Sequence, residues 1–185
     1  VVISWSQSSS KALYVKTITI EYSVGSIKTL SSAVSPVGSG SVELGKTSLA
    51  PDETTTATAT ANDGYEFSSW EISGTGASLS SASTNPTTVT MGSADATVTA
   101  NFSCVTPTFS TNLSTEPVNY TTGASASALT VAASANNASI TYLWQSSTNG
   151  SSWSSASGTN NTANYTPSTA SAGTMYYRCI ATNAA

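Results

Sequence analysis

The side chains that could do chemistry in this chain are few, and their types limit what that chemistry would be. The sequence contains no histidine, which excludes a Ser-His-Asp triad, histidine acid or base catalysis and histidine metal sites. Asp52-Glu53 is the one adjacent pair of acids, and two carboxylates could act on a glycosidic bond. Because the pair follows Pro51, the alternative is a solvated turn. We expect no catalytic residues and therefore no enzyme.

Two further motifs are typical of ligand sites but are better explained by turns. Asp63 precedes Gly64, as in an Asx turn, and no spaced Asp or Asn ligands of the calcium-loop type surround it. Gly38-Ser39-Gly40 suggests a phosphate loop, but no helical pattern follows, so we expect a hairpin turn. The sequence predicts no metal site and no cofactor.

Three side chains remain as candidate contacts or cross-links. Trp153 follows a polar turn, and an exposed Trp would stack on a sugar ring or anchor a protein partner. The alternative is that Trp153 folds back onto the sheet edge beside Trp144. Cys104 and Cys179 are the two cysteines, compatible with one disulfide in an oxidising compartment or with two reduced thiols.

The composition favours a strand-rich chain outside the cell. Only 8% of residues are charged, so solubility would depend on Ser, Thr and Asn. The net charge of −4 comes with no basic patch, which argues against nucleic acid as a partner. No apolar run approaches the ~20 residues that cross a membrane. The chain has neither an initiating Met nor a positively charged leader, so we expect a processed product or a fragment, extracellular or on the cell surface.

The middle of the chain is organised around a strand, a turn and an aromatic cluster. Thr and Ala alternate over residues 56–61, the turn residues Asn62-Asp63-Gly64 follow, and Tyr65, Phe67 and Trp70 come next. Tyr65 and Phe67 share a face of an extended strand, and the two serines before Trp70 allow a bend there. We expect all three aromatics to anchor the core of this region.

Residues 24–103 are predicted to form one module. The expected strands are 26–34, 41–44, 54–61, 65–72, 87–91 and 96–102. The runs VSPVGSGSV (34–42), ATANDGYEFSSW (59–70), NPTTVTM (85–91) and VTANF (98–102) resemble the divergent internalin B-repeat family of bacterial surface modules. The resemblance implies a small all-β module, either β-grasp-like or a sandwich, that is used in tandem and carries no catalytic residues.

Residues 104–185 are predicted to form an immunoglobulin-like β-sandwich. Its strands B, C and F would be residues 129–132, 140–144 and 174–180. Trp144 stands where such sandwiches bury the strand-C Trp, and Tyr177, two residues before Cys179, matches a tyrosine corner. The runs YLWQSSTNGSSW, NYTP and GTMYYRC resemble the Ig-like domains of secreted Bacteroidetes-type proteins. The chain departs from antibody-type domains at Val131, which replaces the strand-B Cys and excludes the B–F disulfide.

Residues 1–23 are predicted to form a β-hairpin that belongs to a preceding domain or serves as an assembly strand. An Ig-like sandwich needs a strand G beside strand F, yet little sequence follows strand F. Either the natural protein continues, or Tyr14–Tyr22 of another copy adds to Met175–Ile180 and forms a homo-oligomer.

The function expected from these observations is a non-catalytic spacer, stalk or adhesive module of a secreted or surface bacterial protein, with an unknown protein or glycan as ligand. The alternatives are a carbohydrate-binding accessory module, which would show a strip of exposed aromatics on one sheet face, and a subunit of a strand-exchange filament.

Overall fold

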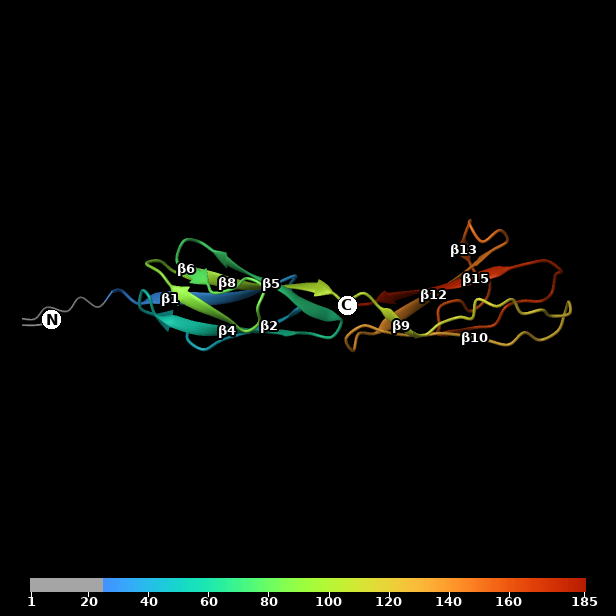
Figure 1. The fold of residues 1–185 in the computed structure, drawn as a ribbon, viewed down its shortest axis with the longest axis horizontal. Helices are drawn as coiled ribbons and strands as arrows, with labels where there is room; N and C mark the ends of the chain where they lie inside the picture. The colour runs from blue at the N-terminus through green and yellow to red at the C-terminus, as the bar shows by residue number, and fades with distance from the viewer. Residues whose placement is uncertain (1–24) are drawn as a thin grey trace, which may run out of the picture.

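The computed structural model describes residues 25–185, which form two β-sheet units arranged end to end (Figure 1). The first unit comprises residues 25–104, the second comprises residues 108–185, and residues 105–107 connect them. The prediction of an all-β fold is confirmed, because the described residues contain strands and turns but no helix. Accordingly, nothing in residues 25–185 is a helix long and apolar enough to span a membrane. The hairpin predicted for residues 1–23 lies outside the described residues.

The first unit is a sandwich of two four-stranded sheets. Its strands are β1 (Lys28–Ser35), β2 (Gly40–Leu44), β3 (Ser48–Leu49), β4 (Thr54–Ala61), β5 (Tyr65–Ser73), β6 (Ala77–Leu79), β7 (Thr87–Met91) and β8 (Ala96–Cys104). One sheet has the order β3-β1-β8-β5 and the other the order β2-β4-β7-β6. Strands β1 and β8 pair in parallel and the other neighbours pair antiparallel. Of the two predicted forms, the sandwich is the one observed.

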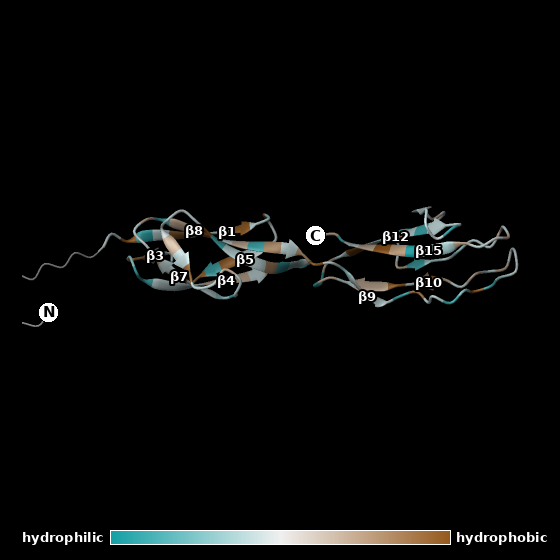
Figure 2. Ribbon diagram, turned by 45° about the horizontal axis from the view of Figure 1, so that its top comes forward, coloured by the Kyte–Doolittle hydropathy of each residue, from teal (hydrophilic) through white to brown (hydrophobic). Residues whose placement is uncertain are grey.

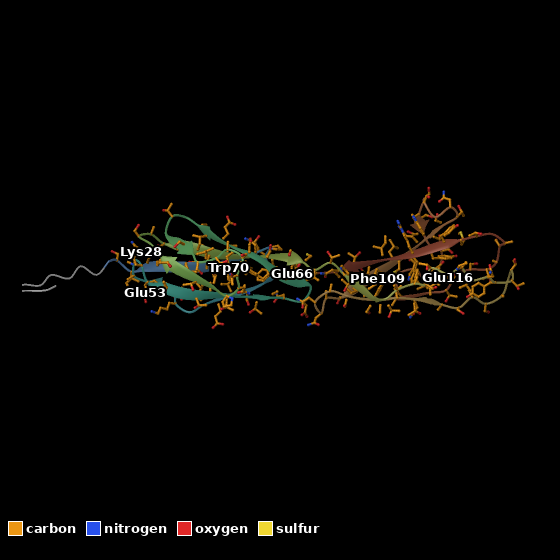
Figure 3. The ribbon with its side chains drawn as sticks, viewed as in Figure 1. Lys28, Glu53, Glu66, Trp70, Phe109 and Glu116 are labelled. Carbon is orange, nitrogen blue, oxygen red and sulfur yellow. The ribbon has the colours of Figure 1, made fainter. Side chains whose placement is uncertain are left out.

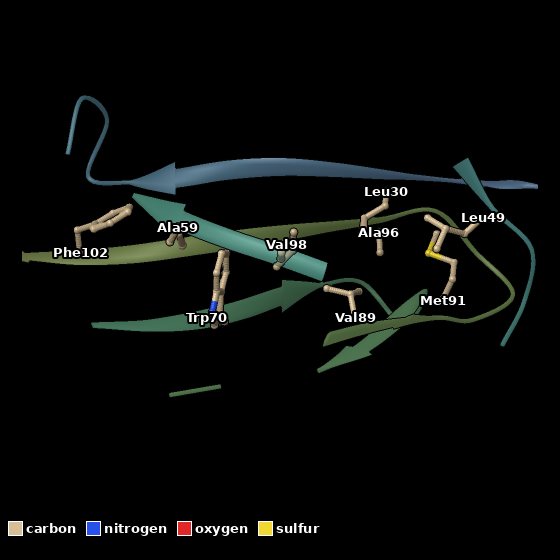
Figure 4. Close-up of a cluster of buried hydrophobic side chains, with 11 residues drawn as sticks. Leu30, Leu49, Ala59, Trp70, Val89, Met91, Ala96, Val98 and Phe102 are labelled. Carbon is tan, nitrogen blue, oxygen red and sulfur yellow. The ribbon is translucent and has the colours of Figure 1, made fainter. Parts of the chain in front are cut away.

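The core of the first unit fills the space between these sheets, as the close-up in Figure 4 shows. Strand β8 alternates buried and half-buried residues from Ala96 to Phe102, which is the period of a strand with one face on a core. The buried apolar side chains are Leu30, Leu49, Ala57, Ala59, Trp70, Val89, Met91, Ala96, Val98, Ala100 and Phe102. They come from both sheets, so the core is continuous across the sandwich.

A bulge in β5 brings its aromatic residues onto one face. The pairing with β8 shifts between Phe67 and Ser69, and the extra residue of a bulge changes which face the following side chains point to. Trp70 is therefore buried at 3% exposure, while Tyr65 and Phe67 lie half-buried against the same core. The Trp70 ring lies 5.3 Å from that of Phe67.

Two details of the first unit differ from the sequence predictions. Residues 36–39 connect β1 to β2, which belong to different sheets. The hairpin turn predicted at Gly38-Ser39-Gly40 is therefore wrong, and the chain crosses the end of the sandwich. Gly40 is needed there because a Cβ would lie 2.6 Å from the Phe102 ring. Strands β3 and β6 were not predicted, since two or three residues are too short to show a period.

The second unit also has two layers (Figures 1 and 2). Its strands are β9 (Thr108–Thr111), β10 (Leu129–Thr130), β11 (Ala132–Ser134), β12 (Ile140–Ser147), β13 (Ser154–Ser155), β14 (Asn164–Tyr165) and β15 (Tyr176–Asn183). Strands β13-β12-β15 form one layer, and the pairs β10-β14 and β11-β9 lie in the other. Val131, Trp144, Ala156 and Tyr165 are buried between the layers.

The strand predicted at residues 129–132 is interrupted at Val131. Its first part pairs with β14 and its second with β9, and the Val131 N–H donates instead to the carbonyl of Ala163. The break turns the buried Val131 side chain, 2% exposed, toward Trp144.

Strand β15 covers residues 176–183, which is later and longer than the predicted 174–180. It pairs with β12 along its whole length, from Tyr176 opposite Ser147 to Asn183 opposite Ile140. No other strand of residues 25–185 pairs with β15.

Candidate functional site

The turn at Asn62–Gly64 forms a joint between the two units. It connects β4 to β5 at the end of the first unit that faces the second, and Tyr65 N–H donates to Asn62 O at 3.0 Å to close it. Gly64 has φ +81 and is buried. Glycine adopts this left-handed conformation at little steric cost. In Figure 3, the labelled residues Glu66 and Phe109 mark the two sides of the joint.

Asn136 of the second unit binds this turn through two hydrogen bonds. The Gly64 N–H donates to Asn136 O at 2.8 Å, and the Asn136 side-chain amide donates to Tyr65 O at 2.6 Å. Asn136 and Asn137 have φ of 40 and 59, and Ala138 N–H donates to Ala135 O. Two successive positive φ values define a type I′ turn, in which Asn is favoured. The Asn pair therefore shapes the loop that binds the first unit.

Asn183, at the end of β15, completes the joint. Its side-chain amide donates to Gly64 O at 2.8 Å and to Val105 O at 3.0 Å. Val105 N–H also donates to Gly64 O. One Asn side chain thus binds the first unit and the connector together.

Gly64 is required by space as well as by conformation. A Cβ on Gly64 would lie 2.5 Å from the Ala185 Cβ, 2.8 Å from Asn183 Oδ1 and 3.0 Å from the Ala138 Cβ. Contacts this short are repulsive, so any larger residue must push the units apart. The joint is therefore closely fitted around a glycine.

The connector restricts the joint further. Strand β8 ends at Cys104 and β9 begins at Thr108, so residues 105–107 are all that joins them. Pro107 has a fixed φ and also restricts Thr106 before it. A short connector and side-chain hydrogen bonds together restrict how the two units can move relative to each other.

Trp153, the predicted ligand contact, lies on the outer face of the second unit. It is half-buried just before β13, and the Arg178 guanidinium carbon stands 4.5 Å from its ring centroid. Arg178 is exposed and pairs with Gln145, whereas its neighbour Cys179 pairs with the buried Trp144. Trp153 folds back onto the sheet, but on the face opposite Trp144 and not beside it as the sequence suggested.

Cys104 and Cys179 are both free thiols in the structure. Cys179 lies four residues before Asn183 on β15, which places it about 13 Å along the strand from the joint. Cys104 lies at the end of β8, and Cα atoms must approach within ~7 Å for a disulfide. Burial raises the pKa of the Cys179 thiol above its ordinary value. A hydrogen bond with the Leu143 backbone lowers the same pKa, but by a smaller amount.

The predicted core anchors of the second unit lie around Trp144, which is fully buried. The Tyr165 ring stacks on Trp144 at 5.5 Å, and Tyr177 lies 5.4 Å from Tyr165. Tyr177 is half-buried against this cluster, and burial raises the pKa of its phenol above the ordinary value.

The acidic pair Asp52-Glu53 lies in a turn at the far end of the first unit. Glu53 forms an ion pair with Lys46 and accepts the Ala50 N–H at 3.0 Å. Two hydrogen bonds lower the pKa of Glu53. The one from Lys46 has the larger effect and the one from the Ala50 N–H the smaller. A carboxyl group held ionised in this way is a poor general acid. Within residues 25–185, no group of three or more acidic or Cys side chains is placed to hold a metal.

Sequence reasoning missed Asn136 and Asn183. The Asn136-Asn137 pair is a turn signal that could have been found. Their contacts with Gly64 and Tyr65 join residues 71 to 119 positions apart, and a single sequence gives no sign of such pairing.

Comparison with known families finds a match, which lies largely within the first unit. The model of the divergent InlB B-repeat domain matches residues 30–106. This part of the chain is therefore similar to that family. This module is typical of bacterial surface proteins and is usually non-catalytic. Neither the curated proteins nor the solved structures contain a significant match to the chain.

Proposed function

We propose that this chain is a non-catalytic spacer of a secreted or surface bacterial protein, in which the B-repeat domain and an Ig-like domain, residues 104–185, are held in line. The observation that carries this proposal is the joint around Gly64. Flexible linkage is the default for domains with small polar interfaces. Here the hydrogen bonds of Asn136 and Asn183, the short connector and the lack of space at Gly64 oppose that flexibility.

The joint suits an extracellular spacer because it contains no ionisable partner. Its donors are two backbone N–H groups and two amide side chains, and its acceptors are all backbone carbonyls. Such bonds contribute roughly 1 kcal/mol each and are insensitive to pH near neutrality and to salt. The arrangement of the two units would then persist across extracellular conditions.

The test is to compare how the two units of the full chain tumble, using 15N NMR relaxation. In the wild type, both units should show one common rotational diffusion tensor. Gly64→Ala should separate the tensors, because the added Cβ overlaps Ala185 and Asn183. Gly158→Ala is the matched control, since Gly158 also has a positive φ, +78, but a Cβ there would meet nothing within 4 Å. Independent tumbling in the wild type, or equal behaviour of both variants, would refute a rigid spacer.

A second candidate function is subunit joining by strand addition, which the unpaired edge of β15 among residues 25–185 favours. The proposed donor, Tyr14–Tyr22 of another copy, lies outside the described residues. Light scattering on the full chain and on a form without residues 1–22 separates the candidates. Concentration-dependent oligomers that vanish with the deletion support strand addition, whereas a monomer in both forms excludes it.

A further inference from the structure

The outer face of the β12–β15 sheet presents a side-chain arrangement that the spacer role does not use. Strand β15 points Tyr177 and Cys179 toward the core and Tyr176, Arg178 and Ile180 to the outside. Tyr176 is 47% exposed and Ile180 39% exposed. This outer face is thus an accessible strip with a cation at its centre.

Arg178 is held in place by its neighbours. Its Nε–H donates to Gln145 Oε1 at 2.7 Å, and its guanidinium lies 4.5 Å from the Trp153 ring centroid. This cation–π contact and one hydrogen bond restrict the guanidinium group, and they leave its terminal nitrogens as donors. Trp153 is therefore a positioning residue for Arg178, since its covered ring face is closed to a sugar.

The positive charge of Arg178 has no local counterpart. It is the only Lys or Arg in residues 104–185, and no carboxylate of the described residues forms an ion pair with it. The planar guanidinium matches a carboxylate through two parallel hydrogen bonds. Charge complementarity therefore indicates a ligand that carries a carboxylate.

Tyr176 supplies an aromatic surface beside that charge. A Cβ on Gly150 would lie 3.8 Å from the Tyr176 Cγ and Cδ1 and 3.9 Å from Cδ2, so the Gly150 turn covers one side of the ring. The ring is nonetheless 47% exposed, which leaves the other side to solvent. Two residues along a strand span about 7 Å, so ring and guanidinium lie within reach of one small ligand.

We propose that the face formed by Tyr176, Arg178, Gln145 and Trp153 binds a polysaccharide that contains uronic acid. A hexuronic acid carries an apolar C–H face and a carboxylate on one ring. The C–H face would lie on Tyr176, and the carboxylate would accept both hydrogen bonds from Arg178. The Gln145 amide, beside Arg178 in the sheet register, is placed to donate to a sugar hydroxyl.

A saccharide fits this face better than a protein surface does. The apolar side chains beside Arg178 are one cross-strand pair, Leu143 and Ile180, at 37% and 39% exposure. A stable protein interface takes roughly 20–30 residues a side with an apolar centre. A short ligand with one carboxylate and one apolar face makes full use of what this strip offers.

The test measures binding of oligogalacturonate to the full chain by calorimetry, with the methyl-esterified oligomer as the neutral comparison. The acid form should bind and the ester should bind about tenfold to a hundredfold more weakly, as expected for loss of charge-assisted hydrogen bonds. Arg178→Gln should give a similar loss, and Arg178→Lys a smaller one because the charge remains but the planar fork is lost. Tyr176→Ala should weaken binding of both oligomers.

Lys46→Gln is the matched control, because it removes one positive charge from the first unit and should leave binding unchanged. Equal binding of acid and ester by the wild type, or no effect of Arg178→Gln in a folded variant, overturns the proposal. Oligoglutamate that binds as tightly as oligogalacturonate also overturns it, since any acidic chain would then suffice. Gly64→Ala should bind normally, so this result is independent of the joint.

Discussion

The two units bury a tryptophan in the same way but surround it with very different amounts of core. In the first unit, the Trp70 N–H donates to Ala82 O at 2.7 Å and its Nε1 donates to Thr84 O at 3.0 Å. In the second unit, Trp144 N–H donates to Asn160 O at 2.7 Å and Nε1 donates to Thr162 O at 2.8 Å. Each Trp therefore binds a loop through carbonyls two residues apart.

The difference lies in what else supports each Trp. Eleven buried apolar residues form the core of the first unit, whereas four form that of the second. Trp70 is one of many contributors between two full sheets, while Trp144 joins two thin layers almost alone. Hydrophobic stabilisation follows the apolar area removed from water, so the second unit should depend far more on its single Trp.

The largest expected effect is that of Trp144→Ala. Truncation of a buried Trp costs about 3–5 kcal/mol, against a typical domain stability of ~5–15 kcal/mol. We expect Trp144→Ala to unfold the second unit, and Trp70→Ala to leave a folded but weakened first unit. Urea unfolding followed by NMR signals from each unit measures both. If both units unfolded, or if both stayed folded, the comparison would be contradicted. Trp153→Ala serves as the control, because this Trp lies outside both cores.

Much of this contrast could be predicted from the sequence. The alternation in residues 54–61 and 96–102 and the aromatic residues near Trp70 and Trp144 indicated the strands and the buried side chains, because these signals are local. The interruption at Val131 could not be predicted, since it depends on the Ala163 carbonyl far along the chain. The joint could not be predicted either, because the sequence explains Gly64 by its turn alone.

A smaller effect is expected when each Trp is replaced by Phe. The ring still fills most of the space, but the Nε1–H is lost and the Thr84 or Thr162 carbonyl loses its donor. Thr84 and Thr162 are exposed, so water can reach the two carbonyls and the loss is that of one ordinary hydrogen bond, roughly 0.5–1.5 kcal/mol. Because the hydrogen bonds are alike, Trp70→Phe and Trp144→Phe should lower the free energy of unfolding of their units by similar amounts. A much larger loss in the second unit would mean that the shape of the Trp ring, and not its hydrogen bond, distinguishes the units.

Alkaline pH should weaken the second unit. Burial raises the pKa values of Tyr177 and Cys179, so the folded state keeps these protons to higher pH than the unfolded state, where the values are near 10 and 8.5. Their contribution to stability is complete below about pH 8.5 and is lost as pH rises through the raised pKa values. Thermal melting of the second unit between pH 8 and 11 measures this loss. Tyr177→Phe with Cys179→Ala should flatten the slope, and an unchanged slope would show that other groups cause it.

The smallest effect concerns acid and the first unit. The Lys46 ion pair and the Ala50 N–H lower the pKa of Glu53, so the folded state releases this proton more readily than the unfolded state. The resulting stability is present above the ordinary Glu pKa of about 4.3 and is lost as pH falls through the lowered value. Because the pair is exposed, solvent screens it and the effect should be slight. Glu53→Gln should reduce the acid slope of the first unit and leave the melting of the second unit unchanged. A change in the second unit would show that stability passes through the joint, and the comparison of two separately stabilised cores would then fail.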